Sequence, residues 1–279
     1  MKLDKGFVGG SMILLVLTLL AEKDYYGYEI IKTLEARSDK TFEFKEGSLY
    51  PVLHRMENEG FVVSYREKIT ESHRVAVPGC YASGSNAILY PLVKSKVMPK
   101  DYPVLIHAVS GYSGAGKKAI AQYEDQNRDF QLESPRLYAL TQQHKHLPEI
   151  KVISGLDFEP IFNPYICDYI QGMSVSVGLH TRLLGKKVTA KDVWELYAEH
   201  YKDCKFVKVC GFMGEGTLSE PFIPANTLAN TNMMELFVYG NDDRIMITTR
   251  FDNLGKGASG AAVQCLNIMM GIDETTSLI

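Results

Sequence analysis

Several features that define specialised protein classes are absent from this sequence. No stretch reaches the roughly 18 apolar residues that a membrane-spanning helix needs. The five cysteines form no C-x-x-C pair and have no metal-ligand spacing, and the formal net charge is only −3. These absences argue against a membrane protein, a disulfide-stapled secreted protein and a protein whose whole surface neutralises phosphates. A reducing, cytoplasmic location fits best.

One apolar run near the N-terminus needs a separate explanation. Lys2 and Lys5 precede the run Met12 to Ala21, which imitates a secretory signal. No small-x-small cleavage site follows the run, so we expect a buried first helix instead. With 46% hydrophobic residues in 279, the chain can form one large core or two modest ones.

The first 70 residues have a helical pattern. After the first helix, we expect a second from Gly27 to about Glu35, and a third that starts near Ser48 and ends at Gly60. A strand follows from Phe61 to Tyr65. Three helices followed by a strand are the order of a winged helix-turn-helix, whose third helix enters the major groove of DNA.

Two stretches of this N-terminal part carry a family resemblance. G-Y-E-I-I-K-T-L-E and E-G-S-L-Y-P-V-L-H-R-M-E-N-E-G-F-V resemble the PadR family of transcriptional regulators, up to about Lys68. The resemblance implies a recognition helix that contacts DNA through Ser48, Tyr50, His54 and Arg55. Tyr50 and His54 have the alternative of packing in the helical core. The first 70 residues hold 10 Lys plus Arg against 11 Asp plus Glu, so no basic face supports DNA binding.

The pattern changes after Ser72 to glycine clusters and strand-helix mixtures, including a strand from Val104 to Val109. We therefore predict an α+β protein with two domains, a winged-helix module over residues 1–70 and a mixed-sheet α/β domain over residues 74–279.

Cys80 stands in the segment V-P-G-C-Y-A-S-G-S-N. We expect a strand that ends at Val77, a turn through Pro78 and Gly79, and a helix from about Ser83 to Val93. A thiol at a helix N-terminus is favoured as the thiolate, because unsatisfied N–H groups and the helix dipole lower its pKa. The alternative is a small buried structural cysteine.

The segment Q-Q-H-K-H-L-P-E-I places His144 and His146 on one face if it is extended. Three roles compete for this pair: zinc ligands without an obvious third partner, a structural pair, or a general acid/base. Glu149 either orients an imidazole or caps a turn. We predict no metal site.

A glycine-rich stretch, S-G-Y-S-G-A-G-K-K, follows the strand at Val104 to Val109. Gly111 to Lys117 matches the G-x-x-x-x-G-K spacing of a P-loop, but Lys118 stands where a P-loop needs Ser or Thr for magnesium. The stretch is then either an anion-binding loop of backbone N–H groups or a glycine turn with solvated lysines.

From about Arg74 onward the chain resembles the short bacterial N-acetyl-γ-glutamyl-phosphate reductases. Four motifs carry the resemblance: P-G-C-Y, S-G-x-S-G-x-G, H-x-H-x-P-E-I and N-L-G-K-G-A. The resemblance implies that Cys80 is the nucleophile and that His144 or His146 is its acid/base partner. It also implies a sheet face that forms homo-oligomer contacts. The implied phosphate-binding residues are Ser110, Gly111, Ser113, Gly114 and Lys117, and those beside the nicotinamide of NADP are Asn253, Gly255 and Lys256.

Two departures from the family pattern are visible. Val77 stands where the family usually has Asn, and no dinucleotide-binding G-x-x-G-x-x-G turn precedes the cysteine, since Gly9 and Gly10 lack the strand and the spacing. Three hypotheses remain: an NADP-dependent reductase of an acyl phosphate, a PadR-type DNA-binding regulator whose second domain dimerises or senses a metabolite, and a rearranged chain with neither activity.

Overall fold

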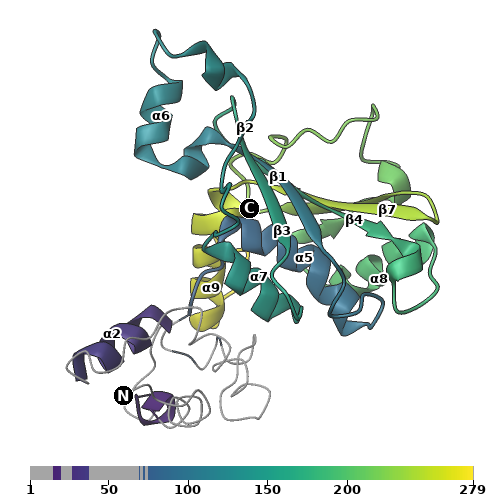
Figure 1. Cartoon of the computed structure of the whole chain (residues 1–279), viewed down its shortest axis with the longest axis horizontal. Coiled ribbons are helices and arrows are strands. Elements are labelled where there is room, and N and C mark those ends of the chain that lie inside the picture. The colour runs from purple at the N-terminus through teal and green to yellow at the C-terminus, as the bar shows by residue number, and fades with distance from the viewer. Residues whose placement is uncertain (1–14, 20–26, 38–68, 70–71, 73–74, 279) are drawn as a thin grey trace. The chain divides into compact units, whose positions relative to one another are not determined.

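The computed structural model describes residues 15–19, 27–37, 69, 72 and 75–278 (Figure 1). The chain divides into two compact units. One comprises Met1–Val77 and Gln264–Thr276, and the other Pro78–Val263 and Ser277–Ile279.

The first unit contains two of the expected helical segments. Residues 15–19 are helical and bury Val16 and Leu19, as expected of an apolar helix that is folded into the protein. The second segment is α2 (Gly27–Arg37), which buries the adjacent Ile30 and Ile31 together with Leu34, one turn further along the same helix face. The predicted third helix and strand lie outside the described residues, as do Ser48, Tyr50, His54 and Arg55.

The described part of the second unit is built on a mixed seven-stranded sheet with the order β2-β3-β1-β4-β7-β6-β5. The pairs β1·β3 and β5·β6 are parallel, and the other neighbours are antiparallel. The prediction of a mixed-sheet domain is confirmed. The strands are β1 (Leu105–Gly111), β2 (Arg136–Leu137), β3 (Ile161–Cys167), β4 (Met173–His180), β5 (Val207–Val209), β6 (Met234–Gly240) and β7 (Arg244–Phe251).

Helices cover one face of this sheet (Figure 1). α5 (Cys80–Lys94) packs on β4 and β7, α7 (His146–Ser154) packs on α5, and α8 (Ala190–Tyr201) packs on β5 and β6. The remaining helices are α6 (Lys117–Tyr123) and α9 (Gly260–Met269), the π-helix η5 (Gly255–Ser259), and the short 3-10 helices η1 (Tyr112–Ala115), η2 (Phe130–Glu133), η3 (Thr181–Leu183) and η4 (Phe212–Gly214).

The two faces of the sheet differ in polarity because successive side chains on a strand point to opposite sides. The helix-covered face carries the core, with fully buried side chains from the strands and from α5: Ile106, Val175, Val177, Leu236, Ile247, Ile88, Leu89 and Leu92. The opposite face carries hydrogen-bonded polar pairs. Ser176 and Thr248 share a bond of 2.8 Å, and the Arg250 guanidinium binds the Glu235 carboxylate at 2.8 Å.

One predicted element is missing from the described structure. Residues 75–79 do not pair as a strand, so the expected strand that ends at Val77 is not formed. Gly79 is extended, with φ −69° and ψ 150°, and it leads directly into α5. Extended dihedrals without a neighbouring strand satisfy no ladder hydrogen bonds, and this leaves the Gly79 amide free for a side-chain acceptor.

Candidate active site

Cys80 is the first residue of α5, with Gly79 as the N-cap. The Gly79 carbonyl oxygen accepts hydrogen bonds from the Ser83 amide at 2.8 Å and from the Ser83 hydroxyl at 3.1 Å. We call residues 78–81 the cysteine turn. The prediction of a thiol at a helix N-terminus is confirmed, although the helix begins three residues earlier than expected.

The acidity of this thiol differs from the expectation. Burial raises the pKa of Cys80 above its usual value, while the Tyr81 amide and the Lys145 ammonium lower it and the Glu149 carboxylate raises it further. Desolvation therefore outweighs the helix N-terminus, and the predicted low pKa is wrong. A thiol in this setting needs a base to remove its proton.

The two histidines belong to a helix start and not to an extended segment. His146 opens α7, and the imidazole ring of His144 lies 4.8 Å from that of His146 between centroids, at 72°. His144 Nδ1 accepts a hydrogen bond from the His146 backbone amide at 3.3 Å. The two rings are therefore in contact, as expected. They are brought together by the turn that leads into α7 and not by an extended segment.

His146 lies directly against the cysteine turn. Its imidazole packs on the Cα atom of Gly79 so closely that a Cβ atom on Gly79 would overlap the ring. The side chain is 7% exposed, and its Nδ1 atom has no hydrogen-bond partner among the described residues. Burial, with the nearby His144 and Lys145, lowers the pKa of His146 to about 4, so the ring is neutral at pH 7.

An aromatic cluster surrounds His144. Its ring centroid lies 5.8 Å from that of Tyr81, 6.0 Å from that of Tyr138 and 5.1 Å from that of Phe162. Burial, followed by Lys145, lowers the pKa of His144 as well. This cluster fixes the plane of His144, which in turn holds the backbone of His146.

Of the two roles expected for Glu149, the described residues show a bond to a turn and not to an imidazole. Its carboxylate accepts hydrogen bonds from the Gly79 amide, at 3.2 Å to Oε1 and 3.4 Å to Oε2. Among the described residues, no hydrogen bond joins Glu149 to either imidazole. Burial raises the pKa of this carboxyl, and the Gly79 amide and Lys145 hold it down.

The glycine loop (residues 110–116) is tied to the end of β7 through one side chain. Asn253 is 2% exposed, donates from Nδ2 to Ser113 Oγ at 3.1 Å, and accepts at Oδ1 from the Gly172 amide at 2.8 Å. A Cβ atom on Gly114 would lie 3.2 Å from both Asn253 Nδ2 and Ser110 Oγ. The structure therefore brings Ser110, Ser113 and Gly114 together with Asn253.

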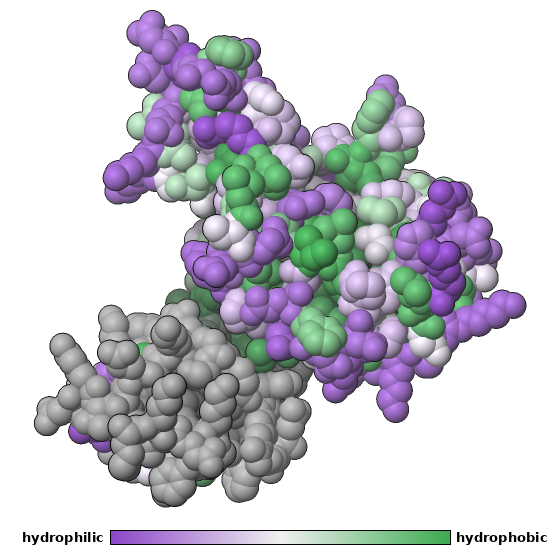
Figure 2. Space-filling view, viewed as in Figure 1, coloured by the Kyte–Doolittle hydropathy of each residue, from purple (hydrophilic) through white to green (hydrophobic). Residues whose placement is uncertain are grey.

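The two candidate lysines come from different elements. Lys117 is exposed at the start of α6, after Gly116 with φ +84°. Lys256 Nζ lies 5.4 Å from the centroid of the Phe206 ring. We call residues 117–135 the α6 arm; it projects from the sheet in Figure 1, and its visible surface in Figure 2 is mostly hydrophilic.

The π-helix η5 completes the surroundings of Cys80. A Cβ atom on Gly257 would lie 2.8 Å from Cys80 Cβ, and the Gly257 amide donates to the Asp252 carbonyl oxygen at 2.8 Å. The sequence did not single out Gly257 as a neighbour of the thiol. Only its place within the N-L-G-K-G-A motif could have indicated this contact.

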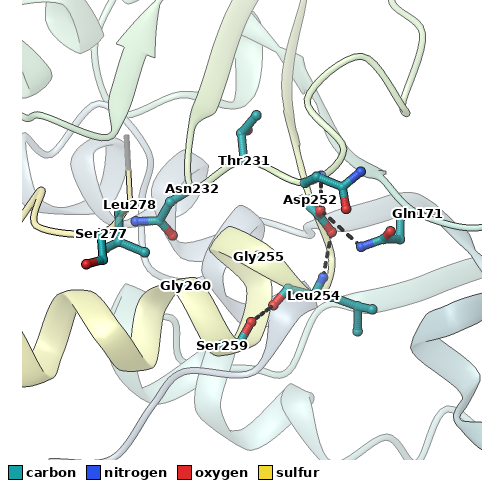
Figure 3. A pocket seen from close by; sticks show the side chains of 11 residues that line it. Gln171, Thr231, Asn232, Asp252, Leu254, Gly255, Ser259, Gly260, Ser277 and Leu278 are labelled. Atoms are coloured by element: carbon teal, nitrogen blue, oxygen red, sulfur yellow. Dashed lines mark hydrogen bonds between the residues drawn. The ribbon is translucent and has the colours of Figure 1, made fainter.

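A hollow of about 440 Å³ lies beside η5 (Figure 3). At one side of it the buried Asp252 carboxylate accepts from Gln171 Nε2 at 3.3 Å, from the Leu254 amide at 2.8 Å and from the Asn230 amide. Sequence reasoning missed these residues, apart from Gly255, because they come from separate loops. The lining residues are Gln171, Asn230, Thr231, Asn232, Asp252, Leu254, Gly255, Ser259, Gly260, Ser277 and Leu278.

The described residues contain neither a cluster of metal-ligating side chains nor a helix suited to cross a membrane. No group of three or more His, Cys, Asp or Glu side chains in this part of the chain gathers as metal ligands do. Within the same residues, none of the helices combines the length and the apolar character that crossing a membrane requires.

Comparisons with known proteins place this fold in a class. Residues 80–253 match the family model described as the semialdehyde dehydrogenase dimerisation domain. The fold is similar to aspartate semialdehyde dehydrogenase from Francisella tularensis, with TM-score 0.51 and 15% identity over 69% of this chain and 64% of that one. It is also similar to aspartate semialdehyde dehydrogenase II from Vibrio cholerae, with TM-score 0.53 and 15% identity over 74% and 66%. The second unit has the fold of a semialdehyde dehydrogenase dimerisation domain.

Sequence relatives narrow this class. The chain is 42% identical over 209 residues to N-acetyl-gamma-glutamyl-phosphate reductases from Brucella ovis and Brucella canis, which covers 74% of this chain and 67% of each relative. This chain belongs to the N-acetyl-gamma-glutamyl-phosphate reductase family. It spans about two thirds of the length of these relatives and of the similar structures. Residues 16–76 match the PadR-like family of transcriptional regulators.

Proposed function

We propose that this chain acts in the NADP-dependent reduction of N-acetyl-γ-glutamyl phosphate to the semialdehyde, a step of arginine synthesis, with Cys80 as the nucleophile. The observation that carries the proposal is the position of Cys80 at the N-terminus of α5, between Gly257 of η5 and the histidine-bearing start of α7. The names of the relatives supply the substrate class.

The first step is acylation of the thiol. The proton of Cys80 passes to an imidazole, Sγ bonds to the acyl carbon, and the bond from that carbon to the phosphate oxygen breaks, which releases phosphate and leaves a thioester. We assign the proton to His146 and not to His144, because the His146 ring packs directly on Gly79, next to the thiol. His144 then braces His146 through the bond to its backbone amide.

The phosphate of the substrate would lie at the glycine loop. The amides of Gly111, Tyr112 and Ser113 already donate to backbone carbonyl oxygens of residues 169–172, so the anion would meet the loop beyond Ser113. Asn253 holds the loop in place through Ser113. Gly114 and Lys117 complete this proposed phosphate site. Because Lys117 is exposed to water, it would contribute charge and not a fixed contact.

NADP would bind beside η5. The residues there suit the nicotinamide end of the cofactor, because the hollow of about 440 Å³ is lined by the neutral amides Gln171 and Asn232 and by the backbone at Gly255. NADPH, when bound, supplies the hydride that reduces the thioester. Asn253, Gly255 and Lys256 would border the nicotinamide, while Gly257 permits its helix to approach Cys80.

The reverse reaction tests this proposal. With NADP, phosphate and N-acetylglutamate semialdehyde, the purified chain should form NADPH, and Cys80→Ser should reduce the rate by at least about 1000-fold, because the acyl-enzyme can no longer form efficiently. Cys204→Ser, which alters an exposed cysteine, is the matched control and should keep the rate. No NADPH formation by the unchanged chain, or equal rates in the two variants, would reject the proposal.

A second candidate function rests on the PadR match at residues 16–76. The N-terminal part would bind DNA through Ser48, Tyr50, His54 and Arg55, while the dimerisation domain holds two copies together as a homo-oligomer. Salt-sensitive, sequence-selective binding of a palindromic duplex, lost in Arg55→Ala, is the expected result. Failure to bind any operator-like duplex would reject it.

A further inference from the structure

We propose that Glu149 is a positioning residue for Cys80, which it holds through the backbone amide of Gly79, and that its negative charge opposes formation of the thiolate. The inference rests on the proposed role of Cys80 as nucleophile. It replaces the expectation that Glu149 orients an imidazole.

The backbone of Gly79 is engaged on every side. Its amide donates to the Glu149 carboxylate at 3.2 Å, and its carbonyl oxygen accepts from the Ser83 amide at 2.8 Å and the Ser83 hydroxyl at 3.1 Å. Its Cα atom lies against the His146 ring. Since Gly79 immediately precedes Cys80, these contacts fix where α5 begins and hence where the thiol lies.

Among these contacts, the hydrogen bond to Glu149 is the one that joins the Gly79 amide to α7. Glu149 lies in the first turn of α7, 70 residues along the chain from Gly79. An extended residue that pairs with no strand has no backbone acceptor for its N–H, so the half-buried Glu149 carboxylate stabilises it by accepting that hydrogen bond. Loss of the acceptor would leave the N–H of Gly79 unsatisfied and free the turn to move.

The charge of Glu149 acts on the thiol in the opposite sense to that of Lys145. Both residues come from the start of α7, and Lys145 is exposed at its N-cap. Lys145 lowers the pKa of Cys80 and Glu149 raises it, in addition to burial. Tyr81 and Tyr138 also face the thiol. Burial raises the pKa of both hydroxyls, so both are neutral at pH 7. Neutral His146 lies on the neighbouring Gly79.

Two substitutions separate position from charge. Glu149→Gln keeps a carbonyl oxygen that can accept from the Gly79 amide but removes the negative charge. Glu149→Ala removes both the acceptor and the charge. Glu159→Gln, at an exposed glutamate, is the matched control, and Lys145→Gln removes the charge of opposite sign.

The pH dependence of Cys80 alkylation by iodoacetamide, followed on the Cys80 peptide by mass spectrometry, measures the charge effect. The midpoint should fall by about half a pH unit in Glu149→Gln, rise by a larger amount in Lys145→Gln, because Lys145 acts more strongly on the thiol than Glu149 does, and stay constant in Glu159→Gln. An unchanged or higher midpoint in Glu149→Gln would overturn the charge role.

The positioning role is tested by the rate at which acetyl phosphate acylates Cys80. This rate is followed by the mass of the acetylated protein, at a pH above the alkylation midpoint of each variant. The rate should fall about tenfold in Glu149→Ala and stay within about threefold of the unchanged protein in Glu149→Gln. Equal rates in the two variants would overturn the positioning role. If the unchanged protein is not acylated while the alkylation midpoints shift as expected, the proposed function fails and the charge role of Glu149 stands.

Discussion

The cysteine turn and the end of the glycine loop, which leads into the α6 arm, both depend on glycine, but for different physical reasons. At Gly79 a side chain is excluded by a neighbour, because the His146 ring lies where a Cβ atom would be. At Gly116 no atom lies within 4 Å of a Cβ atom, and glycine is favoured by the backbone, whose φ is +84°. A glycine in a motif can therefore be required for two reasons: another group lies where its side chain would be, or the backbone has a positive φ. Only the first reason brings a functional group into contact with the glycine.

The largest effect is expected at the cysteine turn itself. Gly79→Ala should reduce the Cys80-dependent rate by on the order of 100-fold, because the new methyl group displaces the His146 imidazole from the turn. Steady-state NADPH formation measures this. Gly116→Ala is the comparison: the strained backbone should cost about 1 kcal/mol of unfolding free energy, and the loss of rate should stay well below that of Gly79→Ala. Equal rate losses in both variants would remove the distinction between the two glycines.

A middle-sized effect is expected in acid. The pKa of His146 is about 4 in the folded chain, below its usual value of 6.5, so the unfolded chain binds more protons between these values and the fold loses stability as pH falls through them. The loss attributable to His146 is on the order of 2 to 3 kcal/mol. Urea unfolding at pH 7 and pH 4.5 should therefore show a smaller loss in His146→Gln than in the unchanged chain.

The raised pKa of Glu149 acts in the opposite direction, because protonation of that carboxyl favours the folded state at low pH. Comparison with His107→Gln, at an exposed histidine on β1, isolates the contribution of His146. An acid sensitivity that is the same in both variants would mean that His146 is not the buried neutral base described above.

The smallest effect is expected on the α6 arm. Lys117→Ala should change the apparent affinity for phosphate in the reverse reaction by less than about threefold, because a charge exposed to water interacts weakly with a bound anion. A Km for phosphate, measured at two ionic strengths, checks this. A loss of phosphate affinity as large as the loss of rate in Gly79→Ala would mean that Lys117 contacts the substrate directly. The α6 arm would then be as important for the reaction as the cysteine turn.

The sequence predicted the second unit well where local signals decide the structure. The helix behind Cys80, the strand before the glycine loop and the mixed sheet were all expected, because glycine, proline and apolar periodicity act over a few residues. The strand that was expected to end at Val77 is absent, since a strand exists only if another strand pairs with it. Pairing partners are not encoded locally.

Site chemistry was less predictable than the elements that carry it. The thiol pKa was expected to be low from the helix N-terminus alone, but the desolvation of Cys80 arises from packing by segments far away in the chain. Of the two roles expected for Glu149, the bond to an imidazole is not found among the described residues, and its carboxylate binds a turn, at Gly79, that lies 70 residues away. Both outcomes have one cause, which is that burial and long-range partners are properties of the folded chain.

The contrast between the two faces of the sheet also limits how this domain can change in evolution. Ser176 and Thr248 stand opposite each other on the polar face, and their neighbours Val177 and Ile247 point into the core. Deleting a single residue from β4 or β7 would exchange the two sets along the rest of that strand and place Arg250 or Ser176 among apolar side chains. Insertions and deletions in descendants of this gene should therefore collect in the loops between strands, while the strands change by substitution alone.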